Sequence, residues 1–421
     1  MKNRDFYMSQ LMDFKDREQV KVITGVRRCG KSTLLELFKK RLHDDGVTND
    51  RIIHISFDTA EYDRLLDGRA MWEYIRERAN KTIRTYILLD EVQLVSNWER
   101  YVNSLRIDCY SDIYITGSNA SLLATRRSSI LGGRCASVMM YPLSFKEYLD
   151  FNVIEDTDDP DVRQTLIDRK FGEYLQFGGM PTIAGAGMSD AAVKTTLLDI
   201  YDAVISRDVI EKNSVRDPTL LRAVAAYLSD NIGCISSPKK ISDYLTSGGK
   251  KTTSETIDNY LSMLEDSFLF YGVKRYDLKG KQYLRTLGKY YIVDTGVRNA
   301  LLGFNGSGAT PVLGAGYPSG YGFALENIVY FELLRRNGSV AIGKQNGYEV
   351  DFVTDSFDDR KYYQVTATLM DAEMFQREMR PLEAIRDNYE KTILTMDNKR
   401  FITQPRNGIK IVNIIDFLLQ P

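Results

Sequence analysis

The chain has 421 residues, of which 43% are hydrophobic and 27% are charged. This is the composition of a folded soluble protein, and it excludes a chain that is disordered, collagen-like or coiled-coil throughout. Because single hydrophobic cores stop growing near about 250 to 300 residues, the length predicts roughly two to four domains.

Charge and cysteine usage exclude several classes of protein. The 56 Lys and Arg residues balance 57 Asp and Glu residues, so any binding to nucleic acid must be local. The four cysteines form no CxxC pair and there are only two histidines, which argues against a disulfide framework and a zinc site. The sequence shows neither a signal peptide nor an apolar run near the roughly 20 residues of a membrane span. We therefore expect a reduced, cytoplasmic protein without contact to a membrane.

The first third of the chain alternates strand-like and helix-like segments between Glu18 and Pro142. Its strand-like runs are almost continuously apolar or β-branched, and they occupy residues 20–24, 51–57, 85–90, 112–117 and 136–141. This alternation predicts a parallel sheet with helices on both faces.

The remaining segments predict a helical lid, a winged helix and a second α/β unit. Residues 218–294 read helix, helix, helix and hairpin around the turn DLKGK, with Thr252 and Glu255 as a capping box for the third helix. A glycine-rich stretch then forms the clearest linker. The expected boundaries are an α/β core at 1–150, a lid at 151–215, a winged helix at 216–298, a linker at 299–322 and a C-terminal domain at 323–421.

A phosphate-binding loop is predicted where the first strand meets the first long helix. The segment from Gly25 to Ser32 fits GxxxxGK[ST]. In such a loop the backbone amides and the helix N-terminus bind phosphate oxygens, Lys31 reaches the β- and γ-phosphates, and Ser32 ligates magnesium. The predicted nucleotide-binding residues are Gly25, Arg28, Cys29, Gly30, Lys31, Ser32 and Thr33.

An acidic strand end supplies the second half of the predicted site. The strand Tyr86-Ile-Leu-Leu ends in Asp90 and Glu91. Asp90 is predicted to hold magnesium through water, and Glu91 to polarise the attacking water.

With these motifs the chain resembles the AAA+ branch of P-loop ATPases. In that branch another strand lies between the two motif strands and carries a polar sensor, which Asn119, with Ser118 beside it, matches in ITGSN. AAA+ proteins also place an arginine before the fifth strand, where it enters the site of a neighbouring subunit. Arg134 matches that position, and Arg126 and Arg127 compete with it. The resemblance implies ATP and Mg²⁺ as cofactors and a homo-oligomer, for which a hexameric ring is one form.

Nearly the whole chain resembles bacterial and archaeal AAA+ ATPases that carry a C-terminal domain of unknown function, of the AAA_14/DUF4143 type. The segments that carry this resemblance are GVRRCGKSTLL, LLDEVQ, ITGSNA, YPLSFKEYL, GGMP, LENIVYFELLRR and EVDFV. GGMP, at residues 178–181, also resembles the Gly-x-Pro turn with which STAND signalling ATPases contact nucleotide. A simple helix-terminating turn is the alternative.

The winged-helix segment carries only a small excess of positive charge. Between Gly233 and Tyr291 ten Lys and Arg residues face six acids, and Lys250 and Lys251 precede the candidate recognition helix. These lysines and a basic wing at DLKGK would contact DNA phosphates. Docking to protein is the alternative, and the weak charge favours it slightly.

The order of acids in the C-terminal segment resembles the PD-(D/E)xK nuclease fold. Glu326 lies on a predicted helix, and Glu349 and Asp351 lie on a predicted strand. The next strand departs from the pattern, because Gln364 replaces an acid and Thr366 replaces the lysine that activates water. Lys361 is the obvious stand-in base, and Asp351 with Glu326 could still bind a cation. We expect a degenerate, nuclease-derived scaffold.

Together these features predict an α/β protein with a P-loop AAA+ domain, a helical lid, a winged helix and a restriction-endonuclease-like domain. The expected function is magnesium-dependent ATP hydrolysis, coupled to binding of DNA or remodelling of a DNA-bound complex. A STAND-like signalling switch and an ATP-gated nuclease are the alternatives.

Overall fold

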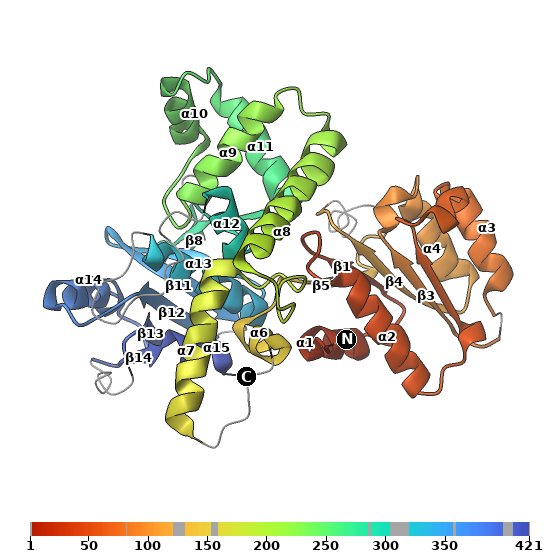
Figure 1. Ribbon diagram of the computed structural model, residues 1–421, viewed down its shortest axis with the longest axis horizontal. Helices are drawn as coiled ribbons and strands as arrows, with labels where there is room; N and C mark the ends of the chain where they lie inside the picture. Colours follow the sequence, from red (N-terminus) through yellow and green to blue (C-terminus); the bar gives the residue numbers. More distant parts are fainter. Residues whose placement is uncertain are drawn as a thin grey trace. The chain divides into compact units, whose positions relative to one another are not determined.

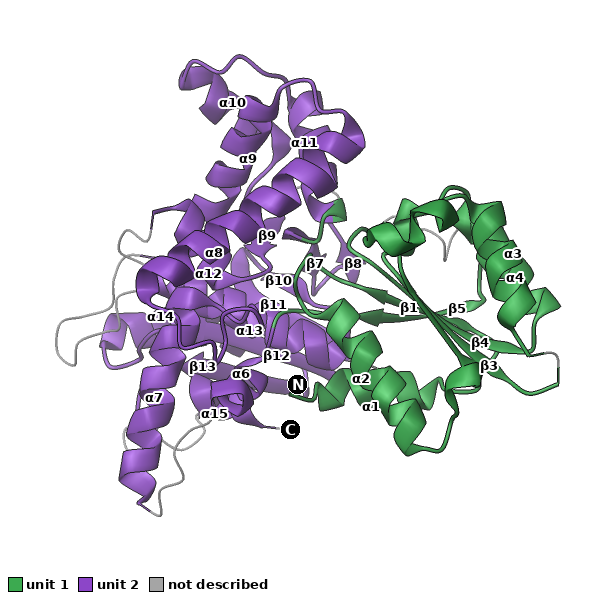
Figure 2. Cartoon of the chain, turned by 45° about the vertical axis from the view of Figure 1, so that its right-hand side comes forward, with its two compact units in different colours: residues 1–142, 266–268 green, residues 143–265, 269–421 purple. Residues whose placement is uncertain are grey.

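The computed structural model describes residues 2–80, 82–120, 131–152, 159–284, 288–303, 320–356, 359–398 and 407–420. They form two compact units, coloured separately in Figure 2. The first comprises Met1–Pro142 with Asp266–Phe268, and the second comprises Leu143–Glu265 with Leu269–Pro421.

The first unit is built on a five-stranded sheet in the order β2-β3-β4-β1-β5. All neighbouring strands in it are parallel. The strands are β1 (Val20–Thr24), β2 (Ile52–Ser56), β3 (Thr85–Asp90), β4 (Ser111–Gly117) and β5 (Cys135–Met139). The predicted parallel sheet is confirmed, and β4 lies between the two motif strands β1 and β3, as the AAA+ resemblance implied.

Helices cover both faces of this sheet (Figure 2). They are α1 (Asp5–Asp13), α2 (Lys31–Asp44), α3 (Gly68–Arg78) and α4 (Trp98–Asp108), with short 3-10 turns at Asn49–Arg51, Ala60–Leu65 and Val92–Leu94. Side chains alternate between the faces along a strand. On β4, Ile113 and Ile115 therefore join the core with residues of α3 and α4, while Tyr114 contacts Phe38 of α2 with ring centroids 4.4 Å apart.

The second unit begins with helices and ends with a mixed sheet (Figure 1). Its helices are α6 (Phe145–Asn152), α7 (Pro160–Phe177), α8 (Asp190–Ala203), the π-helix η4 (Val204–Glu211), α9 (Pro218–Asp230), α10 (Pro238–Ser247), α11 (Ser254–Asp266), α12 (Thr295–Leu301), α13 (Tyr321–Asn337), α14 (Ala372–Glu383) and α15 (Ile414–Leu419). The final residue of α11 falls within the part of the chain assigned to the first unit.

Polar caps begin the three helices of the predicted winged helix. Asp217 and Ser237 each accept a hydrogen bond from a backbone amide two or three residues into the helix, and a proline follows each of them. The third helix is capped by Thr253, whose hydroxyl accepts from the Thr256 amide, and not by Thr252 as predicted. The cap is displaced by one residue because α11 begins at Ser254.

The strands of the predicted wing belong to two different sheets. Strand β6 (Phe270–Val273) pairs antiparallel with β9 (Lys289–Ile292) in a two-stranded sheet. The DLKGK turn instead joins β7 (Arg275–Asp277) to β8 (Gln282–Tyr283), at the edge of a seven-stranded sheet. That sheet has the order β14-β13-β12-β11-β10-β7-β8, with β10 (Ala341–Gln345), β11 (Tyr348–Ser356), β12 (Asp359–Thr366), β13 (Glu390–Thr395) and β14 (Ile409–Asn413).

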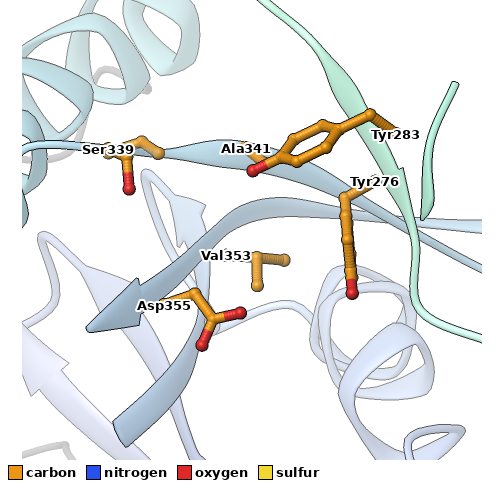
Figure 3. Close-up of a pocket in the computed structure, with 7 residues that line it drawn as sticks. Tyr276, Tyr283, Ser339, Ala341, Val353 and Asp355 are labelled. Carbon is orange, nitrogen blue, oxygen red and sulfur yellow. The ribbon is translucent and has the colours of Figure 1, made fainter. Parts of the chain in front are cut away.

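Burial of Leu278 explains why the turn joins the C-terminal sheet and is not a free wing. Leu278 packs with Val350 and Val353, and its amide donates to the Lys344 carbonyl at 3.0 Å. The Tyr276 and Tyr283 rings meet edge to face beside a cavity of about 20 Å³ (Figure 3). A cavity of this size holds about one water molecule, so it is a packing defect and not a ligand site.

Candidate functional site

The P-loop lies in the predicted context, between the end of β1 and the start of α2. Gly30 precedes α2 with φ of 106°, a backbone conformation that favours glycine. A Cβ atom on Gly25 would lie 2.1 Å from the Met140 carbonyl oxygen, so the loop also needs glycine at its first position.

The side chains of the loop divide into buried and exposed groups. Lys31 is buried, and its Nζ donates to the carbonyl oxygens of Gly25 at 3.0 Å and Val26 at 3.2 Å. Arg28, Ser32 and Thr33 are exposed. Burial raises the pKa of the Cys29 thiol, so this residue contributes its backbone to the loop and not a thiolate.

The acids at the end of β3 are held by hydroxyl groups. Asp90 is 3% exposed and accepts hydrogen bonds from Thr116, and from Ser56 at 3.2 Å, on different carboxylate oxygens. The Thr116 hydroxyl also accepts from the Glu91 amide at 3.0 Å. Thr116 therefore fixes both acidic residues. Ser118 and Asn119 of the same ITGSN segment were predicted from the sequence, whereas Thr116 was not.

The predicted sensor segment lies beside the predicted catalytic acid. Ser118, just after β4, donates from its hydroxyl to Glu91 Oε2 at 3.5 Å, and Gln93 donates to the same oxygen. Asn119 follows and is 4% exposed. Because β4 lies between β1 and β3, its end belongs to the sheet edge where the P-loop begins, which is where parallel α/β sheets bind ligands. The role of Asn119 in orienting water stays a prediction.

The oxygen donors at this edge fit a magnesium ion. Ser32 offers an exposed hydroxyl at the start of α2, and Asp90 offers a carboxylate already oriented by Thr116 and Ser56. Hydroxyl and carboxylate oxygens are the hard ligands that Mg²⁺ uses, commonly together with water and substrate phosphates. Ser32 and Asp90 are therefore the residues that would hold the metal.

Arg134 lies at the opposite edge of the sheet. It is exposed and directly precedes β5, and its carbonyl oxygen accepts from the amide of Val20, the first residue of β1. The P-loop follows the last residue of the same strand. Arg134 is thus on the wrong side of the sheet to complete the site of its own chain. Its competitors Arg126 and Arg127 lie outside the described residues.

An N-terminal helix supports the P-loop, which the sequence analysis did not predict. Arg4, which is 3% exposed, donates to the carbonyl oxygens of Cys29 at 3.1 Å and Tyr141 at 3.0 Å. The Tyr7 hydroxyl accepts from the Tyr141 amide at 3.0 Å. Tyr7 and Leu11 are fully buried at a spacing of four residues, which is a helical signal that could have identified this contact.

The GGMP segment packs against a buried aspartate of α12 within the second unit. Gly178 ends α7 with φ of 77°, and a Cβ atom there would lie 2.1 Å from Asp294 Oδ1. The Gly179 amide donates to Asp294 Oδ2 at 2.7 Å, and the Val297 amide donates to Oδ1 at 3.0 Å. These contacts give the two glycines a structural role at the end of a helix. The nucleotide contact implied by the STAND resemblance stays a prediction.

Asp294 should make this junction sensitive to pH. Burial raises its pKa from 3.8 to about 6, against the opposing effect of the backbone donors, so the folded state binds its proton more tightly than the unfolded chain does. The contribution of Asp294 to the free energy of unfolding is therefore greatest below pH 4. It falls as the pH rises to about 6, by about 3 kcal/mol for a pKa shift of this size. Hydrogen-exchange protection of the α7 end and α12, corrected for intrinsic rates, should fall over that range. An Asp294→Asn variant should lack this dependence, and the same slope in both proteins would contradict the assignment.

The nuclease-like acids lie at one face of the C-terminal sheet. Gln364 and Thr366, which replace the missing acid and lysine of the motif, form hydrogen bonds with other groups of the protein. Gln364 lies opposite Asp351, accepts from its amide at 3.3 Å and donates to Glu378 at 2.9 Å. Thr366 donates to the Thr368 carbonyl. Lys361 lies an odd number of residues from Gln364, so it points to the other face of β12, where it pairs with Asp359. Lys361 is therefore wrong as a stand-in base.

The described part of the C-terminal domain shows no conventional metal centre. Among the residues with described positions, no group of three or more His, Cys, Asp or Glu side chains is arranged to hold a metal ion. The expectation that Asp351 and Glu326 could bind a cation thus finds no support in the geometry.

The basic residues of the winged-helix segment are only partly accessible. Lys239, Lys240, Lys250 and Lys251 are exposed around α10 and the start of α11. The outer face of α11 itself carries acids, including Glu255 and Asp258. Lys289, also counted among the basic residues of this segment, is only 4% exposed.

Comparison with known proteins identifies the class of the first unit and the family of the chain. A model described as an AAA domain, AAA_14, matches residues 17–149, and a domain of unknown function, DUF8612, matches residues 168–308. The chain is therefore an AAA-type ATPase by domain content. The second description differs from the DUF4143 type that the resemblance suggested.

Two relatives extend over almost the entire sequence. The chain is 37% identical to an uncharacterized protein of Haemophilus influenzae over 422 residues, covering 100% of this chain and 99% of that protein. It is 30% identical to an uncharacterized protein of Methanocaldococcus jannaschii, covering 94% of this chain and 85% of that protein. The chain belongs to the same family of AAA-domain proteins as these two.

A solved structure shares the fold. The Walker-type ATPase PABY2304 of Pyrococcus abyssi has a TM-score of 0.51 and 15% sequence identity, covering 72% of this chain and 96% of that one. At this identity the likeness supports the fold alone. No helix within the described ranges is both long and apolar enough to cross a membrane.

Proposed function

We propose that the first unit hydrolyses ATP with Mg²⁺ at the edge of the sheet formed by the ends of β1, β3 and β4. On binding, Lys31 exchanges the carbonyl oxygens of Gly25 and Val26 for phosphate oxygens, and the amides at the start of α2 bind the same negative charge. Ser32 and Asp90 would hold the metal ion, which would supply positive charge to the transferring phosphoryl group.

Glu91 is the group proposed to polarise the attacking water. The observation that carries this role is the pair of contacts from Thr116, which places Asp90 and Glu91 as a unit at the end of β3. Hydrogen bonds from Ser118 and Gln93 orient the Glu91 carboxylate further. An orienting shell of this kind is what a positioned general base requires. Asn119 would read the γ-phosphate or help to orient the water.

The coupled activity is proposed to be binding of DNA or remodelling of a DNA-bound complex. The four exposed lysines around α10, namely Lys239, Lys240, Lys250 and Lys251, support it, with Tyr244 exposed on the same helix. The acidic face of α11 opposes insertion of that helix into the major groove. The observations therefore favour phosphate contacts from the lysines over base readout by α11.

The primary experiment is an ATPase assay with single-stranded, duplex or branched DNA and without DNA. Stimulation by one of them supports the coupling and identifies the ligand. If all rates are equal while a protein partner triggers assembly, the STAND-like alternative is preferred. Scoring the same reactions for strand breaks tests the ATP-gated nuclease. Cleavage that requires Asp351 would support it, although Gln364 and Thr366 lack the chemistry of the missing acid and lysine.

Reversing charge at Lys250 and Lys251 should weaken DNA binding uniformly across sequences. Each phosphate contact contributes about −0.9 to the slope of log affinity against log salt, so the doubly substituted protein Lys250→Glu, Lys251→Glu should lose about one to two units of slope. Titrations at several salt concentrations measure it. The same charge reversal at Lys279 and Lys281 tests whether the turn between β7 and β8 also contacts DNA. An unchanged slope in the first variant would remove Lys250 and Lys251 from the interface.

A further inference from the structure

The second unit contains a cavity of about 860 Å³ beside the nuclease-like acids. Its lining includes Lys289 of β9, Glu326 of α13, and Glu349 and Asp351 of β11. All three carboxylates belong to the nuclease-like order of acids in the sequence, and two of them, Glu326 and Asp351, were expected as possible cation ligands. Lys289 comes from a distant part of the sequence and was not expected near them.

The Lys289 ammonium group lies among the three carboxylates. Its Nζ is 2.8 Å from Glu326 Oε1, 2.9 Å from Glu349 Oε1 and 3.8 Å from Asp351 Oδ1. The first two distances are within hydrogen-bond range, whereas Asp351 contributes a longer electrostatic contact. The lysine side chain is 5% exposed, and those of Glu326 and Asp351 are 8% and 11% exposed. The ammonium group is thus largely buried, while Glu349 is 28% exposed.

Hydrogen bonds from neighbouring groups hold the carboxylates of Glu326 and Asp351 in place. The Tyr291 hydroxyl, two residues along β9 from Lys289, also donates to Glu326 Oε1. The Val365 amide donates to Asp351 Oδ2 at 2.9 Å. Gln364, at the position of the missing acid, has its oxygen directed at the Asp351 amide and its nitrogen at Glu378. Its oxygen is therefore not directed at a cation.

A divalent metal does not fit the residues as they are arranged. Mg²⁺ needs oxygen ligands at about 2.0 to 2.1 Å in near-octahedral geometry, and Ca²⁺ needs six to eight oxygens at about 2.3 to 2.6 Å. An ammonium nitrogen within 3 Å of two of the carboxylates occupies the space that such an ion would need. Its positive charge also repels a second cation and offsets part of the negative charge that would attract one.

We propose that Lys289 permanently replaces the divalent cation of the nuclease-like site, so that the C-terminal cavity is a metal-independent joint between the β6–β9 sheet and the C-terminal domain. The lysine is an internal counter-ion supplied by the winged-helix segment. Its charge stabilises three buried or half-buried acids that lie close together. It is independent of the ATPase proposal, because no residue of the first unit takes part.

Binding of Mn²⁺ to the full-length protein, measured without nucleotide by electron paramagnetic resonance, tests the proposal. Four proteins are compared: wild type, Asp351→Asn, Lys289→Met, and the Lys289→Met, Asp351→Asn double variant. Any Mn²⁺ bound at the ATPase site is common to all four and cancels. Wild type and Asp351→Asn should bind the same amount of Mn²⁺. Lys289→Met should gain one additional site, and the double variant should lose it again.

Thermal stability provides a second measurement on the same proteins. Removing the lysine leaves buried carboxylates without a counter-charge, which strongly destabilises a protein. The melting temperature of Lys289→Met should therefore fall and should be partly restored by Mn²⁺, whereas that of wild type should not respond. Lys289→Arg is the matched control, because it retains the charge and should gain no metal site.

Two results would overturn the proposal. The first is an Asp351-dependent Mn²⁺ site in the wild-type protein, which is measurable even if Lys289→Met fails to fold. The second is a folded Lys289→Met protein that binds no more Mn²⁺ than wild type does.

Discussion

Glu91→Gln is expected to bind ATP normally and to lose most of its turnover. The amide retains the shape of the side chain and can still accept from Ser118, but it cannot polarise water as a carboxylate does. Positioned general-base groups contribute about 10² to 10⁴ in rate, and we expect a loss of kcat in that range. Single-turnover hydrolysis, with nucleotide affinity measured separately, distinguishes the two steps.

Two further variants serve as controls for Glu91→Gln. Lys31→Ala should abolish tight binding of ATP, because it removes the charge that contacts the phosphates. Glu77→Gln, an exposed acid on α3, is the matched control for loss of a carboxylate and should leave both steps unchanged. Undiminished hydrolysis by Glu91→Gln would remove this residue from the mechanism.

Arg134→Ala is expected to reduce hydrolysis only in assembled protein. Arg134 lies beside Val20 at the start of β1, whereas the P-loop follows the end of that strand, so within one chain the guanidinium is at the wrong edge of the sheet. Arginine fingers supplied in trans contribute about 10³ to 10⁵ in rate. We therefore expect a large loss of kcat with nucleotide binding retained.

Mixing two inactive proteins tests whether sites are shared. Arg134→Ala supplies an intact P-loop and Lys31→Ala supplies an intact arginine, so a mixed assembly should recover part of the activity. Arg100→Ala, an exposed arginine on α4, controls for loss of a surface charge. If assembly is intact and the mixture stays inactive, Arg134 does not complete a neighbour's site.

The local motifs of the first unit could be predicted from the sequence because each depends on residues close together in the chain. GxxxxGK[ST] needs a strand before it and a helix after it, and both are visible in the pattern of apolar residues. The five strands of the sheet were predicted for the same reason, since buried parallel strands are continuously apolar. The position of β4 between β1 and β3 came from the AAA+ resemblance, and the sheet confirms it.

The contacts that orient those motifs depend on pairings that the sequence does not show. Thr116 acts on Asp90 and Glu91 because β4 pairs with β3, and Arg4 reaches the Cys29 carbonyl from a separate helix. Each of these residues has an ordinary local sequence. Their importance arises from hydrogen bonds between segments that are 25 or more residues apart.

In the second unit the difference between what the sequence predicts and what the tertiary structure shows is larger. The sequence alone determined that Gln364 and Thr366 depart from a nuclease motif, but it predicted fewer strands and helices after residue 323 than the structure contains. It could not determine that the DLKGK hairpin joins the C-terminal sheet, because that depends on burial of Leu278 against Val350 and Val353. Nor could it determine that Lys289 lies among Glu326, Glu349 and Asp351. A lysine in a basic segment is usually solvated, and only the tertiary structure shows that this one is buried among three acids.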